Sequence, residues 1–184
     1  MIGFVDETLK NLLSRELAQI EDHVYFDAPD RDFKPSLPAV DLFLYDVREN
    51  LDLRSNEWEI ERTGTTATRQ IPPTRVDCSY LITAWAGDIR SEHILLGDIM
   101  RVLLRYTSLP KELLVDRLQD QDLPLPTAVL QPGRLQSVGE FWQALDGKPK
   151  AALNYTVTIA VRPQPTDTAP LVVESSANLK PTAD

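Results

Sequence analysis

The sequence is poor in the residues that build disulfides, metal sites and phosphate-binding loops. Its single cysteine, Cys78, excludes a disulfide framework and indicates synthesis in a reducing compartment. The two histidines, His23 and His93, lie far apart, and zinc needs several His, Cys or carboxylate ligands that converge, so we expect no metal site. The seven glycines are dispersed and form no Walker or dinucleotide-binding fingerprint. We therefore expect no cofactor.

Basic charge and long apolar segments are also scarce. Lys and Arg number 19 against 28 Asp and Glu, and the net charge of −9 argues against nucleic-acid binding, which requires a basic face. No window approaches the roughly 18 apolar residues of a membrane-spanning helix. Residues 1–7 lack the basic and apolar regions of a signal peptide. We expect a protein that is made in the cytoplasm and does not insert into a membrane.

No catalytic constellation is recognisable. A Gly-x-Ser-x-Gly elbow is missing, so a Ser-His-Asp hydrolase has no anchor. Cys78 falls within a predicted strand and is typical of an inert packing residue. Carboxylates do occur close together, but such pairs are common on the solvated faces of acidic chains; they are Asp46 with Glu49 and Asp116 with Asp120. We expect no catalytic residues and no enzymatic activity.

The segment Ile71–Trp85 organises the predicted fold. A double proline opens it and stops any preceding element, because neither ring nitrogen can donate a hydrogen bond. Two apolar faces follow, which indicates a strand in the centre of its sheet. Val76, Cys78, Tyr80, Ile82 and Ala84 form one face, and Asp77, Ser79, Leu81, Thr83 and Trp85 form the other. We expect Ser91 to cap a helix that runs to about Tyr106, with Gly97 packed closely against a neighbour.

The remaining periodicities predict a helix, several strands and a hairpin around this centre. The segment 40–48 is expected to be an internal strand, with Leu42 and Leu44 on one face and Phe43, Tyr45 and Val47 on the other. The other expected elements are a helix at 2–20, a strand at 23–26, a loop at 27–38, a two-stranded hairpin within 50–72 turning at 63–65, a strand at 125–130, a helix at 138–145 and a strand at 153–161.

These elements predict an α/β (α+β) fold. We expect one domain over residues 1–162, with a mixed, mostly antiparallel sheet flanked by two main helices. A hairpin at about 56–71 is expected to project from it, and an isolated hairpin is marginal in water. Residues 163–184 form a Pro- and Thr-rich extended tail without periodicity, which we expect to be disordered unless a partner holds it.

One feature indicates a protein interface. Arginines gather in a single segment of this acidic chain, at 48, 54, 62, 69 and 75, together with Trp58. Arg and Trp are enriched at interfaces, so Trp58, Arg62 and Arg69 are the candidate interface residues. The alternative is that the arginines form weak surface ion pairs across the hairpin with Glu57, Glu59 and Glu61. The sequence leaves both interpretations open.

Four segments, in order, resemble the cap, or tail-terminator, proteins of extracellular contractile injection systems, the phage-tail-like particles exemplified by the antifeeding prophage. They are Leu-Phe-Leu-Tyr-Asp-Val-Arg-Glu-Asn with the later Leu-Arg (42–50 and 53–54), Pro-Pro-x-x-x-Asp-x-x-Tyr-Leu-Ile-Thr-Ala-Trp (72–85), Glu-His-Ile-Leu-Leu-Gly (92–97) and Phe-Trp-Gln-Ala-Leu (141–145). Each segment alone is ordinary strand or helix sequence, and the specificity lies in their order and spacing. The resemblance spans roughly residues 5–161.

The resemblance implies a structural role. Such a cap is a single α/β domain that assembles as a homohexameric ring at the end of the inner tube and sheath distal to the baseplate. It stops tube polymerisation and anchors the last sheath ring by accepting sheath segments at a sheet edge. The implied partners are further copies of the chain, the sheath protein and the inner tube protein. The particle is assembled in the cytoplasm, and either release to the exterior or attachment to a membrane is compatible with the resemblance.

Two other functions are compatible with the sequence. A neck or connector protein of a contractile-tailed phage would have a related fold but would join a DNA-filled head. A small hydrolase or ligand-binding protein is the alternative from another class, and the missing catalytic constellation counts against it.

Overall fold

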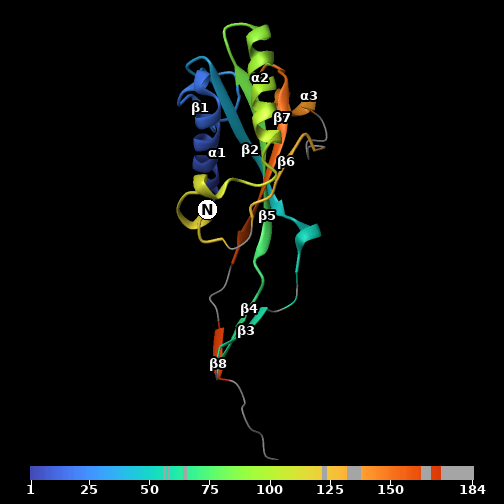
Figure 1. The fold of residues 1–184 in the computed structure, drawn as a ribbon. Coiled ribbons are helices and arrows are strands. Elements are labelled where there is room, and N and C mark those ends of the chain that lie inside the picture. Colours follow the sequence, from blue (N-terminus) through green and yellow to red (C-terminus); the bar gives the residue numbers. More distant parts are fainter. Residues whose placement is uncertain are drawn as a thin grey trace, which may run out of the picture.

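The computed structural model describes residues 1–55, 57, 59–63, 66–121, 124–131, 138–162 and 167–170, of which 59–63, 66–70, 138 and 167–170 are described as backbone. The helices are α1 (Ile2–Glu16), α2 (Ile89–Leu104) and α3 (Val138–Ala144). The strands are β1 (Val24–Tyr25), β2 (Ala39–Glu49), β3 (Glu59–Thr63), β4 (Thr66–Gln70), β5 (Thr74–Trp85), β6 (Thr127–Val129), β7 (Ala152–Val161) and β8 (Asp167–Pro170). They form a sheet of order β1-β2-β5-β7-β6 and a second sheet of order β3-β4-β8 (Figure 1).

The centre of the larger sheet is β5, as its two apolar faces predicted. It pairs antiparallel with β2 on one side and with β7 on the other. The only parallel pair in the described part of the sheet joins β1 to β2. Cys78, Tyr80 and Ile82 on one face of β5 are fully buried, and Leu81 and Thr83 on the opposite face are almost as inaccessible. The mixed α/β architecture confirms the predicted fold class.

The main core lies between one face of this sheet and the helices α1 and α2. Both helices are amphipathic and bury one apolar stripe in this core. Its members are Val5, Leu9, Leu12 and Leu13 of α1 and Leu95, Ile99, Val102 and Leu103 of α2. The Tyr80 hydroxyl of β5 donates a hydrogen bond to Asp6 Oδ1 of α1 at 2.7 Å. Burial raises the pKa of Asp6, while this hydrogen bond opposes the rise. Asp6 therefore ties α1 to the central strand.

The opposite face of the sheet is covered at one end by α3. Trp142 of α3 is 2% exposed. The ring of its neighbour Phe141 lies 6.0 Å from Phe43 and 6.4 Å from Tyr45, measured between ring centroids. This short helix closes a smaller apolar cluster that extends from Phe43 to Leu81.

A β-bulge changes the side-chain alternation of β2. The register shifts between Leu44 and Asp46, so that Val47 lies opposite Cys78 on the same face as Leu44. The sequence analysis placed Val47 on the face of Phe43 and Tyr45, and this prediction was wrong. One inserted residue reverses every later side chain of a strand, because the side-chain period is two.

Two predictions about α2 are also corrected. Asp88 is the N-cap of the helix, because its Oδ1 accepts a hydrogen bond from the backbone N–H of Ser91 at 3.1 Å. Ser91 therefore lies inside the first turn and does not cap it. A Cβ atom added to Gly97 would meet nothing within 4 Å, so Gly97 is not packed closely against a neighbour.

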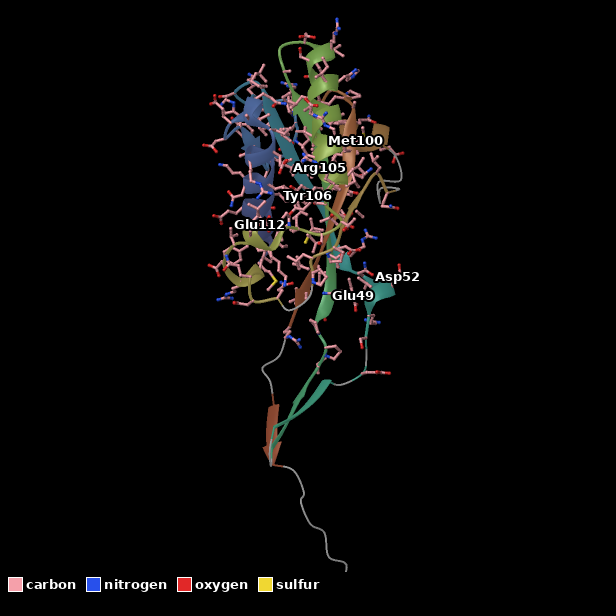
Figure 2. All side chains as sticks on the ribbon, in the orientation of Figure 1. Glu49, Asp52, Met100, Arg105, Tyr106 and Glu112 are labelled. Carbon is pink, nitrogen blue, oxygen red and sulfur yellow. The ribbon has the colours of Figure 1, made fainter. Side chains whose placement is uncertain are left out.

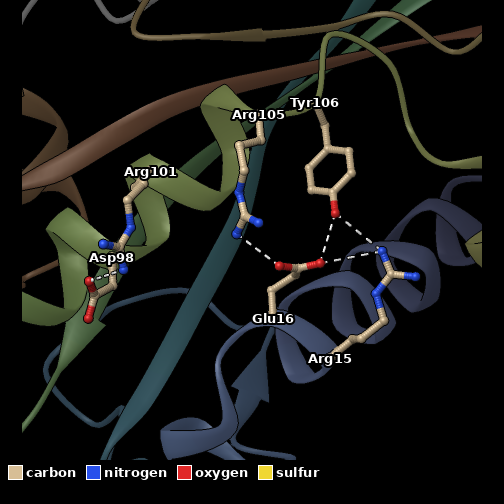
Figure 3. Close-up of polar contacts among 6 residues, drawn as sticks. All are labelled: Arg15, Glu16, Asp98, Arg101, Arg105 and Tyr106. Carbon is tan, nitrogen blue, oxygen red and sulfur yellow. Dashed lines mark hydrogen bonds and ion pairs between the residues drawn. The ribbon is translucent and has the colours of Figure 1, made fainter.

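A polar cluster joins the C-terminal ends of α1 and α2 (Figure 3). Glu16 accepts hydrogen bonds from the Tyr106 hydroxyl at 2.8 Å and from the Arg105 guanidinium, also at 2.8 Å. Arg15 donates to the same tyrosine oxygen at 3.2 Å. The Tyr106 hydrogen bond is the main cause of a lowered pKa for Glu16. The cluster fixes the two core helices relative to each other.

Candidate functional site

The smaller sheet projects beyond the end of the larger one (Figure 1). β3 and β4 form the predicted hairpin, with Glu59 opposite Gln70 and Thr63 opposite Thr66. The residues of the predicted turn, Gly64 and Thr65, lie outside the described residues. β8 then pairs antiparallel with β4. The sequence analysis expected an extended tail after Arg162 that is disordered unless a partner holds it. For residues 167–170 the edge of the hairpin itself is that partner.

The predicted interface residues belong to this sheet or precede it. Arg62 of β3 lies opposite Ala67, and Arg69 of β4 lies opposite Ile60 on one side and Asp167 on the other. Trp58 lies outside the described residues. The sheet thus contains Arg62 and Arg69 within a few register positions of each other, and their role as interface residues stays a prediction.

The other arginines of the segment belong to the larger sheet and its margin. Arg48 donates to Asp46, with 2.8 Å between Nη2 and Oδ1, and Arg54 donates to both carboxylate oxygens of Glu49 at 2.7 and 2.8 Å. These partners differ from the glutamates of the hairpin that the alternative interpretation considered. Asp46 and Glu49, considered above as a catalytic pair, are thus each engaged by an arginine. Arg75 has a buried Nη1 atom without a hydrogen-bond partner among the described residues.

The outer edge of β2 is largely open. β1 pairs only with Val40 and Asp41, whereas β2 extends to Glu49. The backbone N–H of Asn50 donates to the backbone carbonyl oxygen of Arg75 in β5. The backbone N–H of Val40 points the other way and donates to the backbone carbonyl oxygen of His23. Given the bulge, the alternating pattern of an antiparallel pair then directs the backbone groups of Leu42, Leu44, Val47 and Glu49 outward. The sequence analysis expected an internal strand, but beyond Asp41 no described strand covers this edge.

A recess of about 830 Å³ lies where β5 ends and α2 begins. Its apolar walls are contributed by Phe33, Trp85, Ile89 and Leu96. Lys150 closes one side, with its ammonium group 3.6 Å from the Trp85 ring centroid and 2.8 Å from Glu92 Oε1. Both charges of this pair are satisfied locally. Further charged residues line the other side of the recess, where Arg31 and Asp146 form an ion pair at 3.2 Å, so the recess combines an apolar wall with a polar one.

A second recess, of about 300 Å³, lies on the sheet face beyond α3 and is polar. Asp77 at its base accepts hydrogen bonds from Asn50 Nδ2 at 3.0 Å and from the Thr158 hydroxyl at 2.7 Å. Ser79 and Thr156 form a further pair at 3.3 Å. These groups bind one another and connect the side chains of β5 and β7.

Asp41 and Cys78 are buried titratable groups of the strands. Desolvation, together with the nearby Asp27 carboxylate, raises the pKa of Asp41 to about 8, and neither of its oxygens has a well-formed hydrogen bond from the described residues. Burial likewise raises the pKa of Cys78 to about 11. A thiol of this kind is unreactive at neutral pH, which agrees with the packing role expected for Cys78.

The histidines do not form a metal site. His23 Nδ1 lies 3.2 Å from the Pro38 carbonyl oxygen, and His93 is exposed on α2. Within the described ranges, no group of three or more His, Cys, Asp or Glu side chains is placed to hold a metal ion. Nor does any helix in the described part of the chain combine the length and apolarity needed to cross a membrane.

Comparison with known proteins gives two kinds of match. The family model of the Pvc16 N-terminal domain matches residues 4–175. The fold is similar to the sheath/tube terminator of an extracellular contractile injection system (PVC) in its extended state, with a TM-score of 0.75 and 29% identity over 100% of this chain. It is also similar to the tube terminating cap of the anti-feeding prophage, with a TM-score of 0.67 and 26% identity over 96% of this chain. No curated protein matches the sequence.

These matches confirm the resemblance that the four sequence segments carried. The chain spans 64% and 61% of the lengths of the two similar structures. Both similar proteins are thus longer than this chain, which corresponds to the part that carries the projecting sheet and the open edge of β2. Since the family model covers nearly the whole sequence, the chain belongs to the Pvc16 N-terminal domain family.

Proposed function

We propose that this chain is a structural cap that terminates the inner tube and anchors the last sheath ring of a contractile injection system, at the end distal to the baseplate. The similarity over its full length to a sheath/tube terminator carries this proposal. The partners are further copies of the chain in a homohexameric ring, the tube protein and the sheath protein. The chain has no catalytic step in this role, which agrees with the pairing of Lys150 with Glu92 in the larger recess and of Asp77 with Asn50 and Thr158 in the smaller one.

The projecting sheet supports the proposed contacts between subunits. A closed ring needs a heterologous interface, in which one surface of each subunit meets a different surface of the next. An element that extends beyond the body of the domain can reach a neighbour, and β3, β4 and β8 form such an element (Figure 1). Trp58, Arg62 and Arg69 are the proposed contact residues.

Particle imaging tests the proposed function. A strain without the gene should produce tubes of uncontrolled length or unsheathed ends. Joint replacement of Trp58→Ala and Arg62→Ala should reduce the fraction of capped particles at least tenfold while the purified chain stays folded. Arg117→Ala is a matched control, because Arg117 is exposed on a different surface. Normal capped, sheathed particles from the double variant would refute the interface assignment, and normal particles without the gene would refute the function.

The open edge of β2 is the proposed receptor for a sheath segment. An added strand would bind the outward backbone groups of Leu42, Leu44, Val47 and Glu49. Val47 is 45% exposed, and the geometry above directs its N–H away from β5. Val47→Pro should therefore remove one hydrogen bond to the sheath segment without breaking the pairing with β5.

The expected result of Val47→Pro is sheath that detaches from the cap, seen as unsheathed tube ends, with an unchanged circular dichroism spectrum. Val47→Thr keeps the N–H and should behave as the natural protein does. If Val47→Pro anchors sheath normally, the sheath binds elsewhere on the cap.

A further inference from the structure

The outward face of α2 is apolar and basic. Along this face, three large apolar side chains are exposed: Ile89 at 71%, Ile94 at 58% and Leu104 at 53%. At 3.6 residues per turn, Leu104 lies opposite the buried stripe of Leu95, Ile99 and Val102. Ile89 and Ile94 lie on the two flanks of the same outward half of the helix. Met100, labelled on α2 in Figure 2, is partly exposed and partly packed against the core. Four apolar residues on one exposed helix face indicate an interaction surface.

Two arginines lie on this face, and one of them is paired with a carboxylate of the same helix. Arg90 is exposed, and the Arg101 side chain is 74% exposed although it bonds Asp98 at 2.9 Å. Of the two carboxylates of α2, Asp98 lies between Arg101 and Gln19 and accepts from both, whereas Glu92 binds Lys150 on the side of the recess. No ion pair with Arg90 occurs among the described residues, so its positive charge is available to a partner. In a chain of net charge −9, this face is therefore suited to an acidic partner.

The shape of the face also favours close docking. Gly97 lies at its middle, and an added Cβ would meet nothing within 4 Å, so a partner can approach the helix backbone there. At the N-terminal end of α2, Ile89 and Leu96 line the recess of about 830 Å³ described above. The apolar face thus continues into a hollow that can receive a side chain.

The chain presents a complementary surface at the 3-10 turn Leu51–Leu53. Leu51 is 67% exposed and Leu53 is 45% exposed, with Asp52 between them. Asn50 holds the turn in place, because its Oδ1 accepts the Leu53 N–H at 3.1 Å while its Nδ2 donates to Asp77 at 3.0 Å. This turn is a rigid, acidic element with two projecting apolar side chains.

We propose that the outward face of α2 binds the Leu51–Leu53 turn of a second copy of this chain. The two leucines insert beside Gly97 and into the adjoining recess, and Asp52 faces Arg90 and Arg101. Asp52 lies near the base of the projecting sheet while Met100 lies among the helices, so the two surfaces are distinct (Figure 2). Contact between distinct surfaces of identical subunits is heterologous, which is the geometry of a ring. The inference rests on the proposed function.

Disulfide trapping tests the contact directly. Leu53→Cys combined with Gly97→Cys, in the complete chain mixed with tube and sheath proteins under mild oxidation, should give a ladder of linked multimers that reduction abolishes. The natural Cys78 does not interfere because it is buried. Leu53→Cys combined with Asn11→Cys, on the exposed side of α1, is the control and should give no covalently linked multimers. Equal ladders in both variants, or capped particles without any ladder from the first, would overturn the proposal.

Charge exchange tests the pairing. Asp52→Lys alone, or Arg90→Glu with Arg101→Glu, should weaken self-association at least tenfold, measured by native mass spectrometry, and combining all three should restore it to within about threefold. A combined variant as weak as either parent overturns the contact. So does an α2 variant that self-associates normally but no longer binds tube or sheath, which would assign the face to those partners. Failure of the natural chain to multimerise beside tube and sheath proteins would instead overturn the proposed ring itself.

Discussion

The two sheets of this protein differ in what stabilises them. The five-stranded sheet carries α1 and α2 on one face and α3 on part of the other, and its central strand is buried on both sides. The three-stranded sheet extends beyond all three of these helices (Figure 1). Small sheets gain stability mainly by packing a face against another element. The comparison teaches that packing against helices stabilises the larger sheet, whereas the smaller sheet lacks a helix of the described chain against its faces and is therefore the proposed site of contact with a partner.

The same division is visible in the side chains near the boundary. Val76 and Cys78 on β5 belong to the main core, whereas Leu51 and Leu53, on the turn just before the projecting sheet, are large and exposed. Exposed apolar residues on a rigid turn do not stabilise a monomer. They lower the free energy of the protein only when another surface covers them, which agrees with assembly into a particle.

The largest expected effects separate folding from assembly. Ile82→Ala should cost about 2–5 kcal/mol of unfolding free energy, because it leaves a cavity in the fully buried centre of β5. Replacing residues 57–70 with a Gly-Ser linker of equal length should change the unfolding free energy by less than about 1 kcal/mol, yet abolish capping. Urea titration and particle imaging measure the two quantities. A linker variant as unstable as Ile82→Ala would show that the projecting sheet also supports the core.

The sequence predicted the larger sheet better than the smaller one. The segment Ile71–Trp85 is apolar on both faces, and both faces of a strand are buried only in the centre of a sheet. α1 has one apolar stripe, so only one face of this helix can pack against the core. β8 carries no alternation, and only the free edge of β4 determines that this segment becomes a strand. Local composition also does not encode the bulge of β2, because a register shift depends on both paired strands.

The candidate site was predictable only in part. The alternation within 50–72 predicted the projecting hairpin, and the interface role of the arginine cluster with Trp58 stays a prediction. The partners of Arg48 and Arg54 were not predictable, because Asp46 and Glu49 compete with every other carboxylate. The apolar and basic face of α2 is readable from helical spacing once the buried stripe is known. The Asp88 cap was missed because Ser91, three residues later, is an equally good capping residue by composition.

A second prediction concerns the pH dependence of the larger sheet. Burial raises the folded-state pKa of Asp41 to about 8, above its ordinary value of 3.8. A carboxyl whose pKa is raised by folding contributes stability below its ordinary pKa and loses it as the pH rises through the folded value. The protein should therefore unfold at a lower temperature at pH 9 than at pH 6.

Asp41→Asn removes this titration and should flatten the dependence, with a gain of about 1–3 kcal/mol over the natural chain at pH 9. Asp116→Asn is the control, because Asp116 is exposed. The Gly-Ser linker variant should keep the natural pH dependence, since Asp41 lies in the larger sheet. A linker variant with a flat pH profile would contradict the separation of the two sheets.

A third effect is expected at Gly147, which follows α3 and lies against the loop that contains Pro29. A Cβ added to Gly147 would lie 2.8 Å from the Pro29 carbonyl oxygen and 3.1 Å from the Trp142 ring. Gly147→Ala should therefore force these loops apart and cost about 1–3 kcal/mol. Gly87→Ala is the matched control, because nothing lies within 4 Å of its added Cβ. Equal melting temperatures for the two variants would mean that the loops yield without cost.

The smallest expected effect tests the polar cluster that joins the C-terminal ends of α1 and α2 (Figure 3). Glu16→Gln weakens the charged acceptor of the Tyr106 and Arg105 hydrogen bonds and should cost about 0.5–1.5 kcal/mol at pH 7. Because folding lowers the pKa of Glu16, its contribution is present above the ordinary value of 4.5 and lost as the pH falls below it. The natural and variant proteins should therefore converge in acid. Glu112→Gln should be silent, since Glu112 is 66% exposed and 3.6 Å from Arg15. If Glu16→Gln still lowers the free energy of unfolding in acid, the polar cluster stabilises the protein by side-chain packing, because packing does not depend on the ionisation of Glu16.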